Sequence, residues 1–297
     1  MSIKKITIIG LGLMGGSLGL SLKKKIAEVE VRGVDQCGEL VCQAEKRGAV
    51  DYGTVNLEEG VIGADLIFLA TPVSVMPLLC AEMAPYLKDG AIVSDLGSVK
   101  EQLVECLEEI LPARVFFLGG HPMAGSEKGG ITEASADLLE NAAYLLTPTA
   151  RTKAQVIDSL SALLARLGAK VILLSPLEHD RKVAAVSHLP HVLASALINT
   201  VGSLEEEEGG YFLLAAGGFR DTTRIAGSQS EMWSEILLQN KKALLPLLKD
   251  LRQVLAEYEV ALEKEEQVYL RGLLEKARQR RERVLENYGD MVRRSRI

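Results

Sequence analysis

The sequence of 297 residues is poor in aromatic residues and cysteines, and each scarcity narrows what the protein can be. Aromatic side chains make up 4% of the chain, which argues against a surface that stacks nucleic-acid bases. The cysteines include no pair with the two-residue gap of a thioredoxin or zinc motif, and a chain of this length needs no disulfide framework. Free thiols suit a reducing compartment, so we expect a cytoplasmic protein. The four cysteines are Cys37, Cys42, Cys80 and Cys106.

Positively charged residues are also fewer than negatively charged ones. Lysine and arginine number 34 against 40 aspartates and glutamates, which gives a net charge of −6. A mildly acidic chain gives no support to nucleic-acid binding, and we predict no nucleic-acid partner. Apolar residues at 47% and charged residues at 25% are ordinary for a globular protein. At about 150 residues per domain, the length predicts two domains.

An apolar run near the N-terminus, Ile6 to Leu22, follows two lysines and therefore resembles a secretory signal peptide. Five glycines interrupt this run. Glycine at that density suits a turn and a closely packed helix better than a lipid-spanning segment. We therefore expect a soluble protein that has no membrane partner.

Short apolar runs alternate with helix-like segments through the first half of the chain. This alternation predicts a doubly wound parallel sheet of the Rossmann type, in which helices connect the strands. The predicted strands are Ile6–Ile9, Val29–Val34, Leu66–Leu69, Ala91–Val93, Val115–Leu118, Tyr144–Leu146 and Val171–Leu174. The predicted helices are Ser17–Lys25, Leu40–Arg47, Val75–Leu87, Val99–Leu111 and Ala154–Leu167.

The pattern changes after Ser175 and Pro176, where strand-like runs end and helical periodicity takes over. We therefore place a domain boundary near residue 174. Residues 1–174 are expected to form a nucleotide-binding α/β domain, and residues 175–297 an all-helical domain.

A glycine-rich turn follows the first predicted strand. Residues 10–15 read Gly-Leu-Gly-Leu-Met-Gly, and Asp35 ends the second predicted strand 20 residues after Gly15. This spacing is typical of a dinucleotide-binding unit. Gly10 is expected to make the tight turn, Gly12 to let the backbone approach a pyrophosphate, and Gly15 to let helix and strand pack closely. A glycine hairpin that binds no ligand is the alternative.

The start of the helix after this turn also points to a dinucleotide. The backbone N–H groups near Leu13 and Met14 face an anion along the helix dipole. The Asp35 carboxylate accepts hydrogen bonds from ribose hydroxyls and repels a 2′-phosphate, which predicts NAD rather than NADP. Arg32 is the residue that would argue for NADP if its side chain reached this region.

Two residues after the strand Leu66–Leu69 are further candidates for the cofactor site. Ligands of such sheets lie at the carboxyl ends of the strands, so we expect Thr71 and Pro72 to line the cofactor. A plain turn that ends the strand explains Pro72 equally well.

His121 lies in the segment Gly119–Glu127, which follows a predicted strand. We expect this segment to be a loop and its imidazole to project into the ligand crevice, because binding residues concentrate on loops over a rigid sheet. A buried histidine that is hydrogen-bonded by the backbone is the alternative.

The motif Ser187-His188-Leu189-Pro190-His191 carries two histidines at helical spacing. Such a pair can bind zinc, but the only nearby candidates for further ligands are His179 and Asp180, so we predict no metal site. Ser187 and His191 are four residues apart and are expected to share one helix face.

Arg220 and Arg224 are one helical turn apart in the stretch from Gly217 onward. A guanidinium binds a carboxylate through two parallel hydrogen bonds, which makes either arginine a candidate for an acidic substrate. A surface ion pair with Asp221 or Glu231 is the alternative.

Together these motifs resemble the prephenate/arogenate dehydrogenase family of tyrosine biosynthesis, and the resemblance covers essentially the whole chain. The glycine-rich motif is shared with many dehydrogenases, whereas the others in this order are specific. The motifs that carry the resemblance are residues 10–17, Asp95–Lys100, Gly119–Glu127, Ser187–His191, Gly217–Arg224 and Met232-Trp233.

The resemblance implies an NAD-dependent enzyme that oxidises the ring hydroxyl of prephenate or arogenate and releases the ring carboxylate as CO₂. It implies that His121 is the catalytic histidine, that Ser98 supports it, and that Arg224 binds a substrate carboxylate. An imidazole is a suitable base for the hydroxyl proton at neutral pH. The resemblance also implies a homodimer formed through the helical domain. Further positions that it places around the substrate pocket are Ser126, Glu127, Ser187 and His191.

Several alternatives stay open at this point. A hydrogen bond from His191 to a keto oxygen favours prephenate, whereas a carboxylate of Glu127 or Asp221 beside the side chain would favour arogenate. A 3-hydroxyacid or 6-phosphogluconate-type dehydrogenase has the same two-domain plan but typically uses a lysine of the helical domain. A non-catalytic NAD-binding redox sensor would not need His121, Ser98 and Arg224 together.

Overall fold

The computed structural model describes residues 3–126 and 128–294, with side chains of the last helix as far as residue 286. The chain divides into two compact units, Met1–Lys241 and Lys242–Ile297. The first unit contains the α/β part and the first helices after it. The second unit consists of two long helices.

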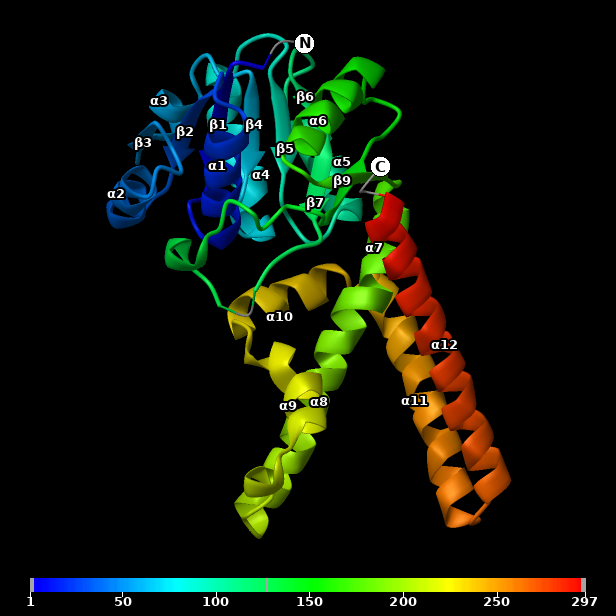
Figure 1. Cartoon of the computed structure of the whole chain (residues 1–297). Coiled ribbons are helices and arrows are strands. Elements are labelled where there is room, and N and C mark those ends of the chain that lie inside the picture. Colours follow the sequence, from blue (N-terminus) through cyan, green and yellow to red (C-terminus); the bar gives the residue numbers. More distant parts are fainter. Residues whose placement is uncertain (1–2, 127, 295–297) are drawn as a thin grey trace. The chain divides into compact units, whose positions relative to one another are not determined.

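The first unit is built on a six-stranded parallel sheet in the order β3-β2-β1-β4-β5-β6, which confirms the predicted Rossmann-type fold (Figure 1). Five of its strands coincide with predicted apolar runs. The prediction missed the edge strand β3, because it has three residues and a glycine at its centre. The strands are β1 (Lys5–Ile9), β2 (Glu30–Val34), β3 (Tyr52–Thr54), β4 (Leu66–Leu69), β5 (Ile92–Asp95) and β6 (Phe116–Phe117).

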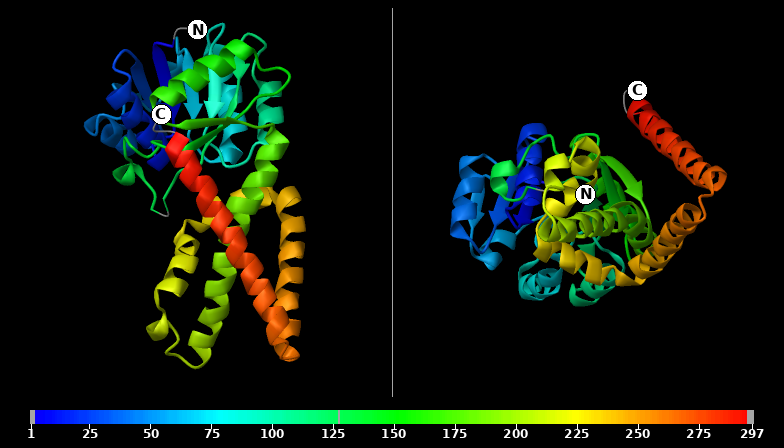
Figure 2. Two further views of the ribbon diagram at one scale, coloured as in Figure 1. Left: turned by 45° about the vertical axis from the view of Figure 1, so that its right-hand side comes forward. Right: turned by 90° about the horizontal axis from the view of Figure 1, so that it is seen from below.

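Helices cover both faces of this sheet (Figure 2). Strand β4 shows why: Leu66 and Phe68 belong to one apolar cluster, while Ile67 and Leu69 belong to the other. Successive side chains of a strand point to opposite faces, so a central strand that is apolar throughout needs cover on both sides. The helices of this α/β part are α1 (Leu13–Lys25), α2 (Gly38–Lys46), α3 (Leu57–Val61), α4 (Met76–Met83), α5 (Glu101–Ile110) and α6 (Ala154–Arg166).

His121 lies in a second sheet of three strands, so the prediction of a loop at this residue is wrong. Strand β7 (Gly119–Pro122) pairs antiparallel with β8 (Ala143–Thr147), and β8 pairs parallel with β9 (Lys170–Leu173). The sequence of β7 is Gly-Gly-His-Pro, which has low strand propensity. Its strand conformation therefore depends on pairing with β8, which local sequence reasoning could not see.

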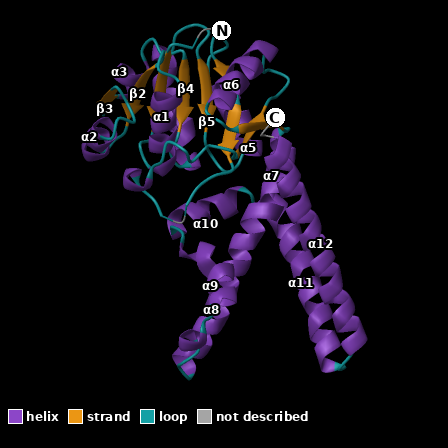
Figure 3. Ribbon diagram, in the orientation of Figure 1, coloured by secondary structure: helices purple, strands orange, loops and turns teal. Residues whose placement is uncertain are grey.

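The elements described after β9 are helical (Figure 3). Helix α7 (Pro176–Val183) begins with a capping box between Ser175 and Glu178, and it continues through a π-helical turn, Ala184–His188, into α8 (Leu189–Glu207). The first unit ends with α9 (Gly217–Thr223), a 3₁₀ turn at Arg224–Gly227, and α10 (Ser230–Gln239).

The continuous helix Pro176–Glu207 is long and apolar enough to cross a membrane by length and composition, a test that core helices of soluble proteins also pass. Its N-terminal half carries buried polar side chains: His179, Asp180, His188 and His191.

The second unit is a helical hairpin formed by α11 (Lys241–Glu263) and α12 (Gln267–Arg294). Glu265 in the connection adopts a positive φ of 55°, which closes the turn between the helices. Large apolar side chains stay exposed on α12, among them Val268, Tyr269 and Leu274.

Candidate active site

The glycine-rich turn lies where β1 leads into α1, at the carboxyl edge of the main sheet. Gly10 has a φ of +96°, and a Cβ there would lie 2.6 Å from the carbonyl oxygen of Ala70. A Cβ at Gly15 would collide with the carbonyl oxygen of Gly10, whereas a Cβ at Gly12 would meet nothing within 4 Å. The structure thus places a tight turn at Gly10, close packing at Gly15, and open space at Gly12, where α1 begins.

Asp35 follows β2 beside this turn. Its Oδ2 accepts a hydrogen bond from the backbone N–H of Leu11 at 2.8 Å, and its Oδ1 accepts one from that of Cys37 at 3.0 Å. These bonds hold the carboxylate in place next to the turn. Arg32 is directed elsewhere, because its guanidinium pairs with Glu30 at 2.7 Å and contacts the carbonyl oxygen of Ile62 at 3.2 Å.

A pocket at this edge is lined by Gly12, Leu13, Met14, Thr71 and Pro72, which the sequence assigned to the cofactor. The Oγ1 atom of Thr71 is buried and has no partner in the described structure. An open glycine at a helix N-terminus, a fixed carboxylate and a hydroxyl without a partner together fit a dinucleotide.

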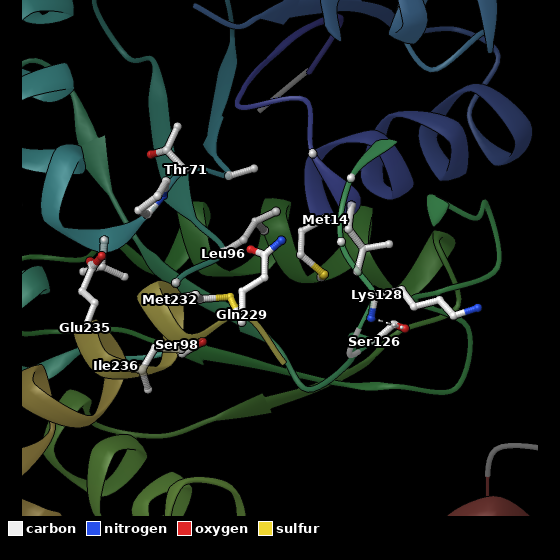
Figure 4. A pocket seen from close by; sticks show the side chains of 18 of the residues that line it. Met14, Thr71, Leu96, Ser98, Ser126, Lys128, Gln229, Met232, Glu235 and Ile236 are labelled. Atoms are coloured by element: carbon white, nitrogen blue, oxygen red, sulfur yellow. Dashed lines mark hydrogen bonds between the residues drawn. The ribbon is translucent and has the colours of Figure 1, made fainter. Parts of the chain in front are cut away.

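Helix α10 closes the same pocket from the other side. Figure 4 shows Gln229 and Met232 reaching toward Met14 and Leu96. The Glu235 side chain ties α10 to the sheet edge, because its Oε1 accepts a hydrogen bond of 2.6 Å from the backbone N–H of Ser74. Of these three residues, only Met232 was noted from the sequence, as part of the Met232-Trp233 motif, and no site role was predicted for Gln229 or Glu235.

A second pocket adjoins the first, and His121 and Arg224 both line it. An imidazole from the first half of the chain therefore shares one cavity with a guanidinium from the second half. Ser98, Ser126 and Ser187 line this pocket as well. The residues that line both pockets are Leu13, Met14, Leu96, Ser98, Ser126, Met232 and Ile236.

His121 lines this pocket, as expected of a side chain that projects into the ligand crevice, but its local structure and its hydrogen-bond partner differ from the sequence-based interpretations. The side chain is 8% exposed and lies on a strand rather than a loop. Its Nδ1 lies 2.8 Å from Nε2 of His179, so its partner is another imidazole rather than the backbone. Burial, together with the ammonium of Lys100 and the neighbouring imidazoles of His179 and His188, lowers the pKa of His121 well below 6.5. The ring is therefore neutral at pH 7 and able to accept a proton.

A buried ion pair lies beside Ser98, which lines this pocket. Lys100 Nζ lies 2.6 Å from Asp95 Oδ2, and both side chains are fully buried. The same ammonium donates to the carbonyl oxygens of Gly97 and Val99, so it holds both flanks of Ser98. Asp95 Oδ1 also accepts from the backbone N–H of Gly120, which connects the ion pair to the strand that carries His121.

Polar residues of α7, of the π-helical turn and of the end of α10 continue the network around His121. His179 Nδ1 lies 2.7 Å from Asp180 Oδ1. Asn240 Nδ2 lies 2.9 Å from the carbonyl oxygen of Asp180 and 3.1 Å from Nδ1 of His188, which lines the second pocket. From the sequence, His179 and Asp180 were candidates only for metal ligands, and nothing pointed to Asn240.

The other predicted site residues lie as follows. His191 is buried, does not line the pocket, and stacks on Trp233, with ring centroids 3.6 Å apart and an interplanar angle of 6°. Trp233 itself lines the pocket. Glu127 lies outside the described residues. Within the described part of the chain, there is no group of three or more histidine, cysteine or acidic side chains that could hold a metal ion.

Known proteins are similar to this chain in sequence and in structure. The family model for the nucleotide-binding domain of prephenate dehydrogenase matches residues 18–173, and that for the dimerization domain of prephenate dehydrogenase matches residues 175–276. The prephenate dehydrogenase of Lactococcus lactis subsp. cremoris (strain MG1363) is 40% identical over 282 residues, which make up 94% of this chain and 77% of that protein.

Two solved structures are similar over almost their whole length. Prephenate dehydrogenase from A. aeolicus, in complex with hydroxyphenyl propionate and NAD⁺, has a TM-score of 0.89 at 32% identity, covering 96% of this chain and 99% of that one. The arogenate dehydrogenase of Synechocystis has a TM-score of 0.79 at 34% identity, covering 94% of this chain and 99% of that one.

Proposed function

Because the chain belongs to the prephenate dehydrogenase family, we propose that it oxidises prephenate with NAD to 4-hydroxyphenylpyruvate and CO₂. This is the activity of an oxidoreductase of tyrosine biosynthesis. The observation that carries the proposal is the pocket that His121 and Arg224 share, next to the pocket under the glycine-rich turn.

The cofactor would be held by the glycine-rich turn and its neighbours. The N–H groups at Leu13 and Met14 would bind the pyrophosphate over Gly12, and Asp35 would bind the adenine ribose. Because Arg32 is engaged by Glu30 and leaves this region, the geometry favours NAD over NADP. NAD, when bound, supplies the hydride acceptor. Thr71 and Pro72 would line the cofactor from β4.

His121 is the base of the proposed reaction. Oxidation of the carbinol carbon removes a hydride from that carbon and a proton from its hydroxyl, and the neutral imidazole takes the proton. The electron pair of the breaking bond to the ring carboxylate then moves through the ring to the new carbonyl oxygen. That oxygen regains a proton as a phenol, so His121 ends the turnover neutral. The aromatic ring drives the loss of CO₂, and the main task of the protein is orientation.

The remaining site residues would bind and orient the substrate. Ser98 lies between the carbonyl groups that Lys100 holds, and we assign it a hydrogen bond to the substrate hydroxyl. Arg224 would bind a carboxylate through its guanidinium. Ser126 and Ser187 would line the ring and side chain. His191 would act through the Trp233 ring on which it stacks.

One property of the second pocket favours prephenate over arogenate. Among the described residues that line it, none is acidic, and Asp221 is not one of them. The side chain of arogenate carries an ammonium group, which needs a negative partner when it is desolvated, whereas the keto group of prephenate needs only a donor.

We also propose that the boundary at residue 174 separates a cofactor-binding domain from a domain that completes the substrate site and forms a homodimer. The family model over residues 175–276 describes a dimerization domain. In the first unit, exposed apolar side chains of the helical part supply surface for such a contact: Leu193, Leu204, Phe212, Leu213 and Leu214. The acidic net charge and the four free thiols suit a cytoplasmic dimer without nucleic-acid or membrane partners.

The test is a comparison of kcat/KM for prephenate and arogenate, each with NAD and NADP, by following the reduced cofactor. We expect prephenate with NAD to give the highest value. Reduction of NAD by 3-hydroxy acids, or NAD binding without turnover of either ring substrate, would contradict the proposal.

A further inference from the structure

We infer that Asp180 fixes two histidines of the substrate pocket in opposite tautomers, so that His121 presents an unprotonated Nε2 and His188 presents an Nε2–H. The tautomers follow from the hydrogen bonds alone. Their consequence for turnover rests on the proposed function.

The first branch runs through the Asp180 carboxylate. Its Oδ1 and Oδ2 accept the backbone N–H groups of Lys100 and Glu101 at 2.8 Å each, which anchors it where α5 begins. A carboxylate only accepts, so the His179 Nδ1 atom at 2.7 Å must carry a hydrogen. Burial lowers the pKa of His179 despite this partner, so the ring is neutral at pH 7 and its Nε2 has a lone pair.

The next ring follows from that assignment. The His179 Nε2 lone pair needs a donor, and His121 Nδ1 lies 2.8 Å away. His121 is therefore the Nδ1–H tautomer, and its Nε2 is the nitrogen left for the pocket. In this arrangement Asp180 and His179 are positioning residues, because they act on the substrate only through His121.

The second branch runs through the main chain of Asp180. Its carbonyl oxygen only accepts, so the Asn240 side-chain atom at 2.9 Å must be the amide nitrogen. The other hydrogen of this NH₂ group points to His188 Nδ1 at 3.1 Å, which must then be an acceptor. His188 is therefore the Nε2–H tautomer. Burial lowers its pKa to about 4, so it donates without carrying a charge.

The titratable and charged groups around these rings support neutral forms of both. His121 faces Lys100 from the residue before α5, His179 from α7 and His188 from the π-helical turn. His188 faces Asp180, His179 and His191. One pocket thus contains a neutral acceptor for the hydroxyl proton and a neutral donor for a substrate oxygen. Loss of the acceptor should lower kcat, and loss of the donor should raise KM.

The direct test needs no turnover. Histidines labelled with ¹⁵N in the full chain, without substrate or cofactor, report which ring nitrogen carries the hydrogen through their chemical shifts. Single replacements by glutamine assign the four signals. At pH 7.5 we expect Nδ1–H for His121 and His179 and Nε2–H for His188. An Nε2–H form of His121, or an Nδ1–H form of His188, overturns the inference, whichever substrate the enzyme uses.

A pair of variants tests the first branch by activity. In His179→Gln, the amide oxygen takes the place of Nε2 and still accepts from His121, whereas His179→Leu leaves Nδ1–H without an acceptor. We expect kcat to be about tenfold or more lower in His179→Leu than in His179→Gln, with KM for the substrate unchanged within about twofold. Equal kcat values in two variants of equal Tm contradict the inference.

Asn240→Asp tests the second branch. The new carboxylate accepts, so His188 should move its hydrogen to Nδ1 and present a lone pair to the pocket. We expect the ¹⁵N signal to report this change and KM to rise about tenfold, which corresponds to one lost hydrogen bond. A signal unchanged from the wild type contradicts the assignment. An inactive wild-type enzyme would contradict the proposed function alone, because the tautomers are read from the spectrum.

Discussion

The cofactor side and the substrate side of the site are built by different means. The cofactor side relies on glycines and backbone groups that lie close together in sequence, such as the turn at Gly10 and the start of α1. The substrate side relies on hydrogen bonds between side chains that are far apart in sequence, such as His121 with His179. Backbone sites depend on shape, whereas side-chain networks depend on every member having its partner. The two sides should therefore respond differently to substitution.

The largest effect is expected on the substrate side, at His121. His121→Asn removes the nitrogen that accepts the hydroxyl proton. We expect kcat to fall by about 10³- to 10⁴-fold while KM changes little, because the lost interaction develops only in the transition state. Steady-state kinetics with prephenate measure both constants. A KM effect as large as the kcat effect would assign His121 to binding instead.

The second-largest effect is expected for Lys100→Met, as a fall in the free energy of unfolding. It leaves the Asp95 carboxylate buried without its ammonium partner, which typically costs about 3–5 kcal/mol. Urea unfolding measures the change. The double variant with Asp95→Asn should recover part of the loss, because it removes the stranded charge. A single variant as stable as the wild type would show that water or a rearrangement satisfies Asp95.

Arg224→Ala should mainly raise the KM for prephenate. Loss of a charge-assisted contact to a substrate carboxylate costs about 1.5–3 kcal/mol, or roughly 10- to 100-fold in KM. Arg220→Ala is the matched control, because Arg220 lies one turn earlier and does not line the pocket. If both variants raise KM equally, the effect reflects the overall positive field rather than a bound carboxylate.

On the cofactor side, Gly12→Ala should raise the KM for NAD by about tenfold, or about 1.4 kcal/mol, and leave the Tm unchanged. A Cβ at Gly12 meets no protein atom within 4 Å, so only the ligand would be displaced. Gly202→Ala in α8 is the control, because it also meets nothing within 4 Å but lies outside the pocket. An unchanged KM for NAD would place the pyrophosphate elsewhere.

The smallest effect is expected from mild acid. A histidine base must be neutral to act, and burial lowers the pKa of His121 well below 6.5. The active form therefore persists as the pH falls through 6.5, and kcat/KM should decline only as the pH approaches the lowered pKa. A pH profile of kcat/KM checks this. A decline centred on 6.5 would indicate an ordinary, solvated imidazole.

The features that could be predicted from the sequence are those determined by residues close together in the chain. Buried strands such as β4 are continuous apolar runs, and the spacing from Gly15 to Asp35 lies within one βαβ unit. The placement of β7 was not predicted, because its four residues form a strand only through pairing with β8.

The hydrogen-bond partners of the site histidines could not be predicted from the sequence for a related reason. His121 and His179 are 58 residues apart, and Lys100 and Asp180 are 80 apart. No periodicity links such positions, so their contact becomes visible only when the sheet edge and α7 are both in place. Asn240 carried no local signal at all, since an asparagine after a helix is an ordinary way to end it.

The π-helical turn at Ala184–His188 determines how a deletion or insertion in this helix changes the direction of the side chains after it. A π turn holds one more residue than an α turn, so positions eight apart across it are in phase as if they were seven apart. His179 then aligns with Ser187, and Asp180 with His188. Deleting one residue from this turn would convert it to an α turn and leave the two flanks of the helix in phase. A residue deleted from α7 before the turn would instead rotate the remainder of the helix by about 100° and carry Ser187 and His188 away from the pocket. Descendants of this sequence can therefore lose one residue within the π turn and keep the phase of the helix, whereas a residue lost from α7 would separate the histidines of this network.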